Sequence, residues 1–373
     1  VEYADHTSTS IYVRFKFDEA DKEKAYKKAG LTSSKDLYAI IWTTTPWTIP
    51  SNMAISMHPR FEYTFFEYKG DVYVVAQELL GSFLADVEWE EKDIKVLGSC
   101  TGSDLELLNT QHPLADRKSP IILGEHVTLD AGTGSVHTAP GHGLEDYEVG
   151  CKYGIKVLSP LDSRGCWTEE VQDKDLEGVP YYKGNKIVIE KLQNCGALLK
   201  QQDISHSYPH CWRCKNPVIY RATPQWFVKV DKFRNETLKA IKDVKWIPAG
   251  GEARISNMVE NRSDWCISRQ RAWGVPIPVF YCEDCGEVIV TDETINHVAE
   301  IFEKESSDAW VKYSAEELLP KGFKCPKCGN HSPKSHFRKE NDIMDVWFDS
   351  GISWRAVVEK RFDELGHIPV DMY

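Results

Sequence analysis

Two short polar segments, about ninety residues apart, constrain this 373-residue chain more than any other feature. The first, residues 42–52, reads WTTTPWTIPSN, and the second, residues 132–147, reads GTGSVHTAPGHGLEDY. Both are dense in hydroxyl and imidazole groups and are interrupted by glycine and proline, which favour turns. A packed core does not need such residues, whereas a pocket that holds a small polar ligand through backbone and hydroxyl groups does.

The two segments resemble the editing pocket of the class I synthetases for branched aliphatic amino acids, above all isoleucyl-tRNA synthetase. The threonine-rich run and the later GTG, VHTAPGHG and EDY runs match that family nearly residue for residue and in the same order. His137 and Thr138 are similar to the isoleucyl type, whereas valyl and leucyl relatives depart there. The resemblance covers essentially the whole chain, as an internal slice of a bacterial-type enzyme.

The resemblance implies post-transfer editing, in which valyl-tRNA(Ile) is hydrolysed at the 3′ end of the tRNA. It assigns Asp146 to the α-ammonium group of the substrate, because a carboxylate forms a charge-assisted hydrogen bond with an amine. The alternative for Asp146 is a plain helix N-cap. Thr43, Thr44 and Thr45 are expected to surround the ester with hydroxyl and backbone groups, unless they are simply β-branched strand residues.

Four further residues complete the predicted pocket: Asn52, His137, His142 and Trp47. We expect His137 to orient a ribose hydroxyl or a water or to limit the pocket size; the alternative is a histidine with a satisfied structural hydrogen bond. His142 is equally open between these roles, and Trp47 is expected to shape a wall. No spacing typical of Ser-His-Asp or Cys-His catalysis is evident. We therefore expect a positioned water, helped by a hydroxyl of the terminal ribose as the family implies.

A second pocket has a clear physical purpose in such an enzyme. One methylene in an apolar pocket gives only about 1–3 kcal/mol of discrimination, a figure known from the isoleucine–valine problem of this very family. A second pocket that admits valine and excludes isoleucine removes the residual error. Two alternatives stay open: the editing region of a valyl enzyme, which hydrolyses threonyl-tRNA, and a zinc-stabilised tRNA-binding module without activity.

Two CxxC pairs predict a structural metal site. Each pair resembles a zinc knuckle, and together they supply four thiolates to one Zn²⁺: Cys282, Cys285, Cys325 and Cys328. His331 is a possible substitute ligand. The segment between the pairs reads as too polar to build a core unaided, so we expect the metal to fold it.

A third pair, Cys211 and Cys214, supplies only half of a tetrahedral site. In the resembled family a second CxxC often lies shortly before the editing insertion, so the missing partners are expected outside this chain. The alternative is a pair of unmetallated thiols. The total of 11 cysteines is odd and the chain is long, which favours metal binding in a reducing cytoplasm over a disulfide scaffold.

The charge and composition limit the partners. A net charge of −12 argues against a generic nucleic-acid binder but leaves room for a tRNA end held by a local basic rim. Candidates for that rim, or ordinary solvated side chains, are Lys215, Arg221, Lys229 and Arg234. No apolar run is long enough for a membrane span, so no membrane partner is expected. We expect a monomer in the cytoplasm of a bacterium, with an organelle as the alternative.

Hydrophobic patterning predicts a mixed α+β chain. Residues 7–17 alternate as a strand, residues 37–44 form an apolar β-rich run, and residues 63–68 and 72–76 read as a hairpin. Helices are predicted at residues 77–87, 145–153, 184–199, 231–244 and 253–261. With its 42% apolar residues the chain is expected to hold two or three domains.

The predicted fold is a β-barrel-like editing domain inserted in a class I Rossmann-type synthetase domain, with a small zinc-knuckle insert. The expected segments are connecting strands at 1–29, the editing domain at 30–204, a returning connective and catalytic piece at 205–281, the zinc insert at 282–338, and a catalytic piece at 339–373. The N-terminus reads as a cut inside a longer protein, and neither a HIGH-like nor a KMSKS-like motif occurs. We therefore expect ATP binding and amino-acid activation only in a full-length enzyme.

Overall fold

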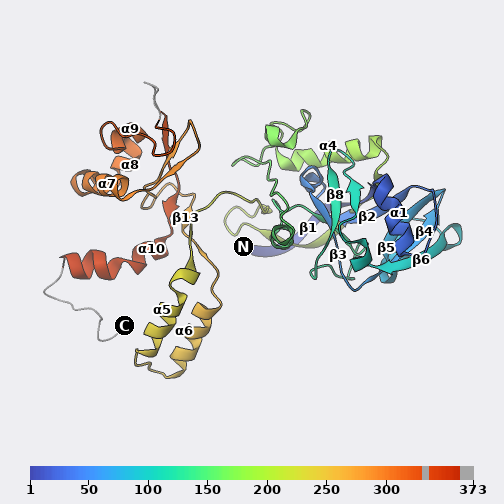
Figure 1. Ribbon diagram of the computed structural model, residues 1–373, viewed down its shortest axis with the longest axis horizontal. Coiled ribbons are helices and arrows are strands. Elements are labelled where there is room, and N and C mark those ends of the chain that lie inside the picture. Colours follow the sequence, from blue (N-terminus) through green and yellow to red (C-terminus); the bar gives the residue numbers. More distant parts are fainter. Residues whose placement is uncertain (330–335, 362–373) are drawn as a thin grey trace. The chain divides into compact units, whose positions relative to one another are not determined.

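The computed structural model describes residues 1–329 and 336–361. His331 and the C-terminal residues 362–373, which include part of the predicted catalytic piece, lie outside the described residues. The chain divides into two compact units, residues 1–223 and 224–373, and each is described by itself (Figure 1).

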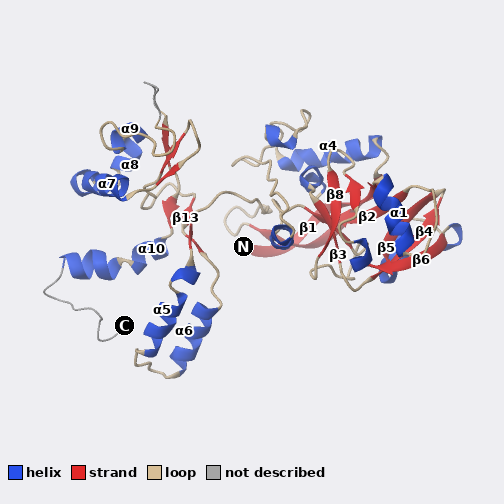
Figure 2. Cartoon of the chain, viewed as in Figure 1, coloured by secondary structure: helices blue, strands red, loops and turns tan. Residues whose placement is uncertain are grey.

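Unit 1 is built on one ten-stranded mixed sheet (Figure 2). The order of neighbouring strands is β10-β1-β7-β8-β3-β9-β2-β5-β4-β6. Their bounds are β1 Glu2–Phe17, β2 Leu37–Thr43, β3 Ala54–Met57, β4 Glu62–Tyr68, β5 Asp71–Ala76, β6 Lys95–Thr101, β7 Asn109–Gln111, β8 Lys118–Leu123, β9 Ser135–Thr138 and β10 Leu198–His210. The predicted strands and the predicted hairpin are confirmed, since β4 and β5 pair antiparallel from Tyr63↔Ala76 to Tyr68↔Asp71.

The long strand β1 closes a ring of paired strands, because it pairs with both β7 and β2. It pairs antiparallel with β10, β7 and β2, so pairings run from β1 through β7, β8, β3, β9 and β2 back to β1. Parallel neighbours occur at β2–β5, β2–β9 and β3–β8. The inward side chains of β1 (Ile11, Val13, Phe15 and Phe17) are at most 1% exposed and belong to the main apolar core.

Four α-helices flank this sheet: α1 Glu19–Lys28, α2 Leu80–Asp86, α3 Leu144–Lys152 and α4 Tyr181–Asn194. The predicted helix over 184–199 was wrong at its C-terminal end, because residues 198–199 begin β10. Gly196 has φ +72°, and the N–H of Ala197 donates to the carbonyl of Leu192. This glycine-centred C-cap ends the helix and frees the following residues for the strand.

Unit 2 contains small antiparallel sheets and short helices. Its strands are β11 Phe227–Val228, β12 Trp265–Cys266, β13 Ser268–Arg269, β14 Phe280–Cys282, β15 Val288–Ile289, β16 Phe337–Lys339 and β17 Ile343–Met344. Its helices are α5 Arg234–Lys242, α6 Gly250–Glu260, α7 Asp292–Glu305, α8 Ala309–Lys312, α9 Ala315–Leu318 and α10 Val346–Gly351. Every strand pair in the described part of this unit is antiparallel, so the parallel sheet of a Rossmann-type piece does not occur there.

The cysteine-rich insert has a small apolar core. Phe280, Trp310 and Leu318 are at most 4% exposed and pack in one cluster. Cys282 and Cys325 are buried in the same cluster. The prediction that metal folds the insert is compatible with this arrangement, because two of the four cysteines are part of the core.

Candidate active site and candidate metal centre

The first polar segment forms the end of β2 and a tight 3₁₀ helix, η1 (Pro46–Ser51). Thr43 Oγ1 accepts a hydrogen bond from the N–H of Thr45 at 3.1 Å, and the Thr48 hydroxyl donates to the carbonyl of Thr45 at 2.8 Å. Since β2 ends at Thr43, Thr44 and Thr45 lie in a turn rather than in a strand. Thr44 is half-buried, and no described group is hydrogen-bonded to its hydroxyl.

His137, on β9, connects the second polar segment to the first. Its Nε2 lies 2.9 Å from Thr48 Oγ1 and its Nδ1 lies 2.8 Å from Asn52 Nδ2. The amide nitrogen of Asn52 can only donate, so Nδ1 of His137 accepts. The proton of the neutral ring is therefore on Nε2, which donates to Thr48 Oγ1. Burial lowers the pKa of His137 to about 3, so the imidazole is neutral. Both ring nitrogens are thus used within the protein, which fits the structural alternative for this residue.

A second buried histidine, His112, is hydrogen-bonded to the backbone of η1. His112 Nδ1 accepts from the N–H groups of Leu114 and Ala115, so its Nε2–H donates to the carbonyl of Ile49 at 2.9 Å. Burial lowers the pKa of His112 to about 3. Arg117 donates through Nε to the carbonyl of Asn52 at 3.0 Å. Sequence reasoning missed both residues, because neither lies in a motif.

Asp146 lies in the first turn of α3, as predicted, but it does not cap that helix. The N-cap is Gly143, and no side chain caps α3. Asp146 Oδ2 instead accepts the N–H of Ala139 at 2.9 Å, across the glycine turn that separates β9 from α3. Burial raises the pKa of Asp146, while the bond from Ala139 and the charge of His126 lower it. Its other oxygen, Oδ1, has no hydrogen bond among the described residues.

His142 and Trp47 lie together at the side of this site. Their ring centroids are 4.9 Å apart, edge to face. His142 Nδ1 donates to the carbonyl of Tyr220 at 3.1 Å, and Nε2 accepts from the hydroxyl of Ser51 at 3.1 Å. Burial lowers the pKa of His142. Trp47 is 5% exposed, and its backbone N–H donates to Asn185 Oδ1 of α4.

The structure therefore brings the two polar segments together. Trp42 of β2 pairs with Val136 of β9, and Ala54 of β3 pairs with Thr138. The bonds Thr48–His137 and Ser51–His142 join η1 to the second segment. One hydroxyl of this site, that of Ser51, donates to a histidine nitrogen, Nε2 of His142, but Ser51 is 0% exposed and is not accessible to a substrate. The imidazoles of His112 and His137 use both ring nitrogens within the described protein. The arrangement suits a bound polar ligand and a positioned water rather than a covalent nucleophile.

The four cysteines of the predicted metal site come together. The sulfur of each lies within 4.8 Å of the other three, and the pairs Cys282–Cys328 and Cys285–Cys325 are 3.6 Å apart. Four thiolates bound to one Zn²⁺ at about 2.3 Å have sulfurs about 3.8 Å apart, so the cluster fits a tetrahedral ion. Burial opposes ionisation of the Cys325 thiol, but hydrogen bonds from the N–H groups of Cys328 and Lys327 and from the neighbouring thiols lower its pKa, while the neighbouring thiols raise the pKa of Cys285.

The turn at Cys211 and Cys214 has the same backbone geometry as the knuckle at Cys282. In the first, the N–H of Lys215 donates to the Cys211 carbonyl and the N–H of Cys211 donates to Asn216. In the second, Gly286 and Glu287 take the places of Lys215 and Asn216. Both fifth residues are left-handed, with φ +59° at Lys215 and φ +72° at Gly286. The third CxxC is thus shaped as a knuckle, although the metal-compatible cysteine cluster of the described residues does not include it.

The predicted basic rim is largely engaged elsewhere. Lys215 pairs with Glu2, Arg234 pairs with Asp231, and Arg221 donates to the carbonyl of Leu161.

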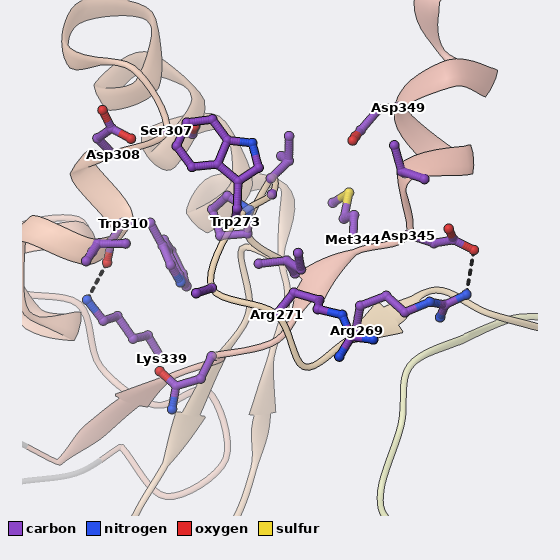
Figure 3. Close-up of a pocket in the computed structure, with 18 residues that line it drawn as sticks. Arg269, Arg271, Trp273, Ser307, Asp308, Trp310, Lys339, Met344, Asp345 and Asp349 are labelled. Atoms are coloured by element: carbon purple, nitrogen blue, oxygen red, sulfur yellow. Dashed lines mark hydrogen bonds and ion pairs between the residues drawn. The ribbon is translucent and has the colours of Figure 1, made fainter. Parts of the chain in front are cut away.

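Unit 2 holds a cavity of about 830 Å³ that the sequence did not indicate (Figure 3). Arg269 and Asp345 form an ion pair of 2.6 Å in its wall, and Asp349 lies on α10 beside them. Trp273 projects across the cavity in Figure 3 and is 92% exposed.

Comparison with known proteins gives consistent results. The family model for "tRNA synthetases class I (I, L, M and V)" matches residues 66–373. The chain is 52% identical over all 373 residues to isoleucine–tRNA ligase of Brevibacillus brevis, and 50% identical over 364 residues to that of Caldanaerobacter subterraneus. It spans 38% of the length of each.

A solved editing domain of the cytosolic leucyl-tRNA synthetase of P. falciparum covers 53% of this chain and 99% of its own, with 11% identity and a TM-score of 0.42. Separately, none of the described helices combines the length and apolar character that crossing a membrane requires.

Proposed function

Because the chain belongs to the tRNA synthetases of class I (I, L, M and V), we propose that it is the editing region of an isoleucine–tRNA ligase and hydrolyses valyl-tRNA(Ile). The observation that carries the proposal is the junction of the two polar segments through Thr48 and His137. The closed strand circuit of unit 1 is then the barrel-like core of the editing domain, which carries the pocket on β2, η1, β9 and α3.

Asp146 is proposed to hold the α-ammonium group of the substrate. Its Oδ2 is fixed by the N–H of Ala139, which leaves Oδ1 to accept from the amine. The carboxylate is partly removed from water, so a bond to a cation is stronger there than at an exposed site. The ammonium would in turn offset the cost of burying the carboxylate, which is visible in its raised pKa.

Thr44 is proposed to contact the substrate directly, since no group among the described residues is hydrogen-bonded to its hydroxyl. Thr43, Thr45 and Asn52 act with His137 to hold the turn in shape. Trp47 and His142 form one wall, which limits the size of the amino-acid side chain that fits. This division follows from which polar atoms the fold already uses.

The reaction needs no covalent intermediate with the protein. A water oxygen bonds to the ester carbonyl carbon, the bond from that carbon to the ribose oxygen breaks, and the water proton passes to the ribose oxygen. The products are valine and uncharged tRNA. The protein's part is to hold the amine and the water so that attack is an oriented, effectively unimolecular step.

The Cys₄ cluster is proposed to bind a structural Zn²⁺ that closes the two knuckles and supplies no chemistry. The knuckle at Cys211 and Cys214 is proposed to hold half of a second site. ATP, isoleucine and the body of tRNA(Ile) are partners of the full-length ligase only. The valyl-type alternative would require hydrolysis of threonyl-tRNA.

The decisive experiment is deacylation of valyl- and isoleucyl-tRNA(Ile) by the whole chain, with Asp146→Ala, Thr44→Val and Thr48→Val beside the wild type. We expect selective loss of valine. Asp146→Ala should lower the rate by at least 100-fold, and because it also removes the bond to the N–H of Ala139 it should lower the melting temperature slightly. Thr44→Val should slow hydrolysis without loss of stability, whereas Thr48→Val leaves Nε2 of His137 without a partner and should cost about 1–3 kcal/mol of unfolding free energy. Full activity of Asp146→Ala would refute the assignment.

A further inference from the structure

The short helix η1 depends on support from outside, because its own backbone can form few hydrogen bonds. Two of its six residues, Pro46 and Pro50, have no N–H to donate. Near its N-terminal end, the N–H of Trp47 donates to Asn185 of α4 at 2.8 Å. The last carbonyls of a helix lack partners within the helix, so the position of the C-terminal end is set by the groups that these carbonyls contact.

The hairpin of β7 and β8 supplies those groups. His112 donates through Nε2 to the carbonyl of Ile49 at 2.9 Å. Arg117 donates through Nε to the carbonyl of Asn52 at 3.0 Å and through Nη2 to the carbonyl of Pro50. The loop of the hairpin is itself closed, since the N–H of His112 donates to the carbonyl of Arg117 at 3.0 Å. Three carbonyls at the C-terminal end of η1 thus have their side-chain partners on one loop.

Arg117 is the stronger of these two supports. Its guanidinium is a cation at the carbonyl end of η1, where the backbone dipoles favour positive charge. A hydrogen bond from a charged donor is also stronger than one between neutral groups. Burial lowers the pKa of Arg117, and its hydrogen-bond partners among the described residues are the carbonyls of Pro50 and Asn52.

The same hairpin fixes the side chain of Asn52. The hydroxyl of Ser119, on β8, donates to Asn52 Oδ1. The amide nitrogen of Asn52 then donates to the carbonyl of Ala54 and to His137 Nδ1, at 2.8 Å each. Nε2 of His137 donates in turn to Thr48 of η1. The hairpin therefore holds η1 directly at its C-terminal end and, through Asn52 and His137, at Thr48.

The residues of the proposed pocket divide into those on η1 and those outside it. Trp47, which is proposed to form a wall with His142, belongs to η1. Asp146, the proposed anchor of the amine, is fixed by the N–H of Ala139, and Thr44 precedes η1. A tilt of η1 about the bond between Trp47 and Asn185 would therefore move the wall and leave the anchor of the amine in place.

We infer that Arg117 is a specificity-determining residue, which holds η1 in the position where Trp47 excludes isoleucine from the pocket. The inference rests on the proposed function. Arg117 is a positioning residue, because it acts through the carbonyls of Pro50 and Asn52. The side chains of valine and isoleucine differ by one methylene, and a closely packed wall responds to a difference of this size. Removal of the guanidinium should therefore admit isoleucine rather than stop the hydrolysis of valine.

The test measures hydrolysis of valyl- and isoleucyl-tRNA(Ile) by the whole chain with Arg117→Met, Arg117→Lys and the control Arg60→Met. Met keeps an unbranched side chain but cannot donate, whereas Lys offers one charged donor in place of the planar fork. Arg60 is an exposed arginine of the same unit that pairs with Glu125. We expect the ratio of valyl to isoleucyl rates to fall at least tenfold in Arg117→Met, because the isoleucyl rate rises, and to fall less in Arg117→Lys. Arg60→Met should keep the wild-type ratio.

A rise in the isoleucyl rate cannot come from lost stability alone. If Arg117 only stabilises the fold, Arg117→Met will have a lower melting temperature, and both rates will fall together at an unchanged ratio, which would overturn the inference. If Arg117→Met does not fold, a wild-type ratio in Arg117→Lys would overturn it.

Binding separates this inference from the proposed function. The probes are adenosine with valine or isoleucine attached to its ribose through an amide, which resists hydrolysis. The wild type should bind the valine probe at least tenfold more tightly than the isoleucine probe, and in Arg117→Met the two affinities should approach each other. A wild type that neither hydrolyses valyl-tRNA(Ile) nor binds the valine probe would refute the proposed function. Hydrolysis and selective binding by the wild type, with the same selectivity in Arg117→Met, would refute only the inference.

Discussion

At the scale of single residues, the turn at η1 is held by imidazoles whose ring nitrogens are bonded within the protein. His137 and His112 are buried and neutral, and each uses both ring nitrogens to fix backbone or side-chain partners around η1. A histidine suits this task because one ring nitrogen donates while the other accepts. The residue type and motif alone could not separate this role from substrate contact, because both need the same two nitrogens. Only their partners decide the matter.

The buried histidines predict an acid-sensitive fold. The pKa of each is about 3, against an ordinary value of 6.5, so between about pH 6 and pH 4 the unfolded chain binds protons that the folded chain does not. Stability therefore falls as pH falls, by roughly 2.7 kcal/mol per pH unit for the two together. Urea unfolding between pH 6 and pH 4 should show this slope, reduced by about half in His112→Asn and in His137→Asn. Asn keeps an acceptor near Nδ1 but does not titrate. An unchanged slope in both variants would contradict the assignment.

Other residues of the site carry no signal in one sequence. Arg117 and His112 support η1 from a loop whose composition is ordinary. Asp146 was predicted from the motif, but its bond to Ala139 required the geometry of the glycine turn.

At the scale of elements, turns were easier to predict than the ends of regular structure. The threonine-rich turn and the CxxC knuckles depend on local residue types that force one backbone path, and each appears where the motif lies. The end of α4 depends on a single residue, Gly196. The apolar pattern of residues 184–199 continues past this glycine, so the pattern alone predicted a helix that was too long. The strand circuit through β1 joins residues nearly 200 positions apart, so no local pattern could reveal it.

The knuckles make a prediction at this scale. The whole chain should bind one tightly held Zn²⁺ at the Cys₄ cluster, and Cys325→Ser should abolish that binding. Because Cys282 and Cys325 are part of the core that contains Trp310, loss of metal should expose that tryptophan and red-shift its fluorescence. Cys100→Ser, a buried cysteine of unit 1, is the matched control and should retain the metal. Equal metal content in all three proteins would exclude the cluster as the site.

At the scale of the whole molecule, the boundary between the two units at residue 223 leaves all residues that support the site within unit 1. The carbonyl of Tyr220 binds His142, and the N–H of Ala222 donates to Gly141, so the glycine turn before Asp146 depends on residues beyond 204. At the other end, β1 supplies one member of the strand circuit and pairs with β10 from Glu2↔His210 to Val13↔Leu198. The segment predicted as the editing domain, 30–204, would lack β1, the end of β10 and the contacts of Tyr220 and Ala222.

Residues 1–223 should therefore fold and hydrolyse valyl-tRNA(Ile) on their own, whereas residues 30–204 should not fold. Removing β1 opens the sheet and exposes the apolar face that Ile11, Val13 and Phe15 now cover, and exposed strand edges favour aggregation. Calorimetry of the whole chain should show two transitions, of which a chelator lowers only the one that belongs to residues 224–373. Fragment 1–223 should reproduce the other transition. A single transition that shifts as a whole with chelator would mean that the two units unfold together, and the independence argued from their separate cores would be wrong.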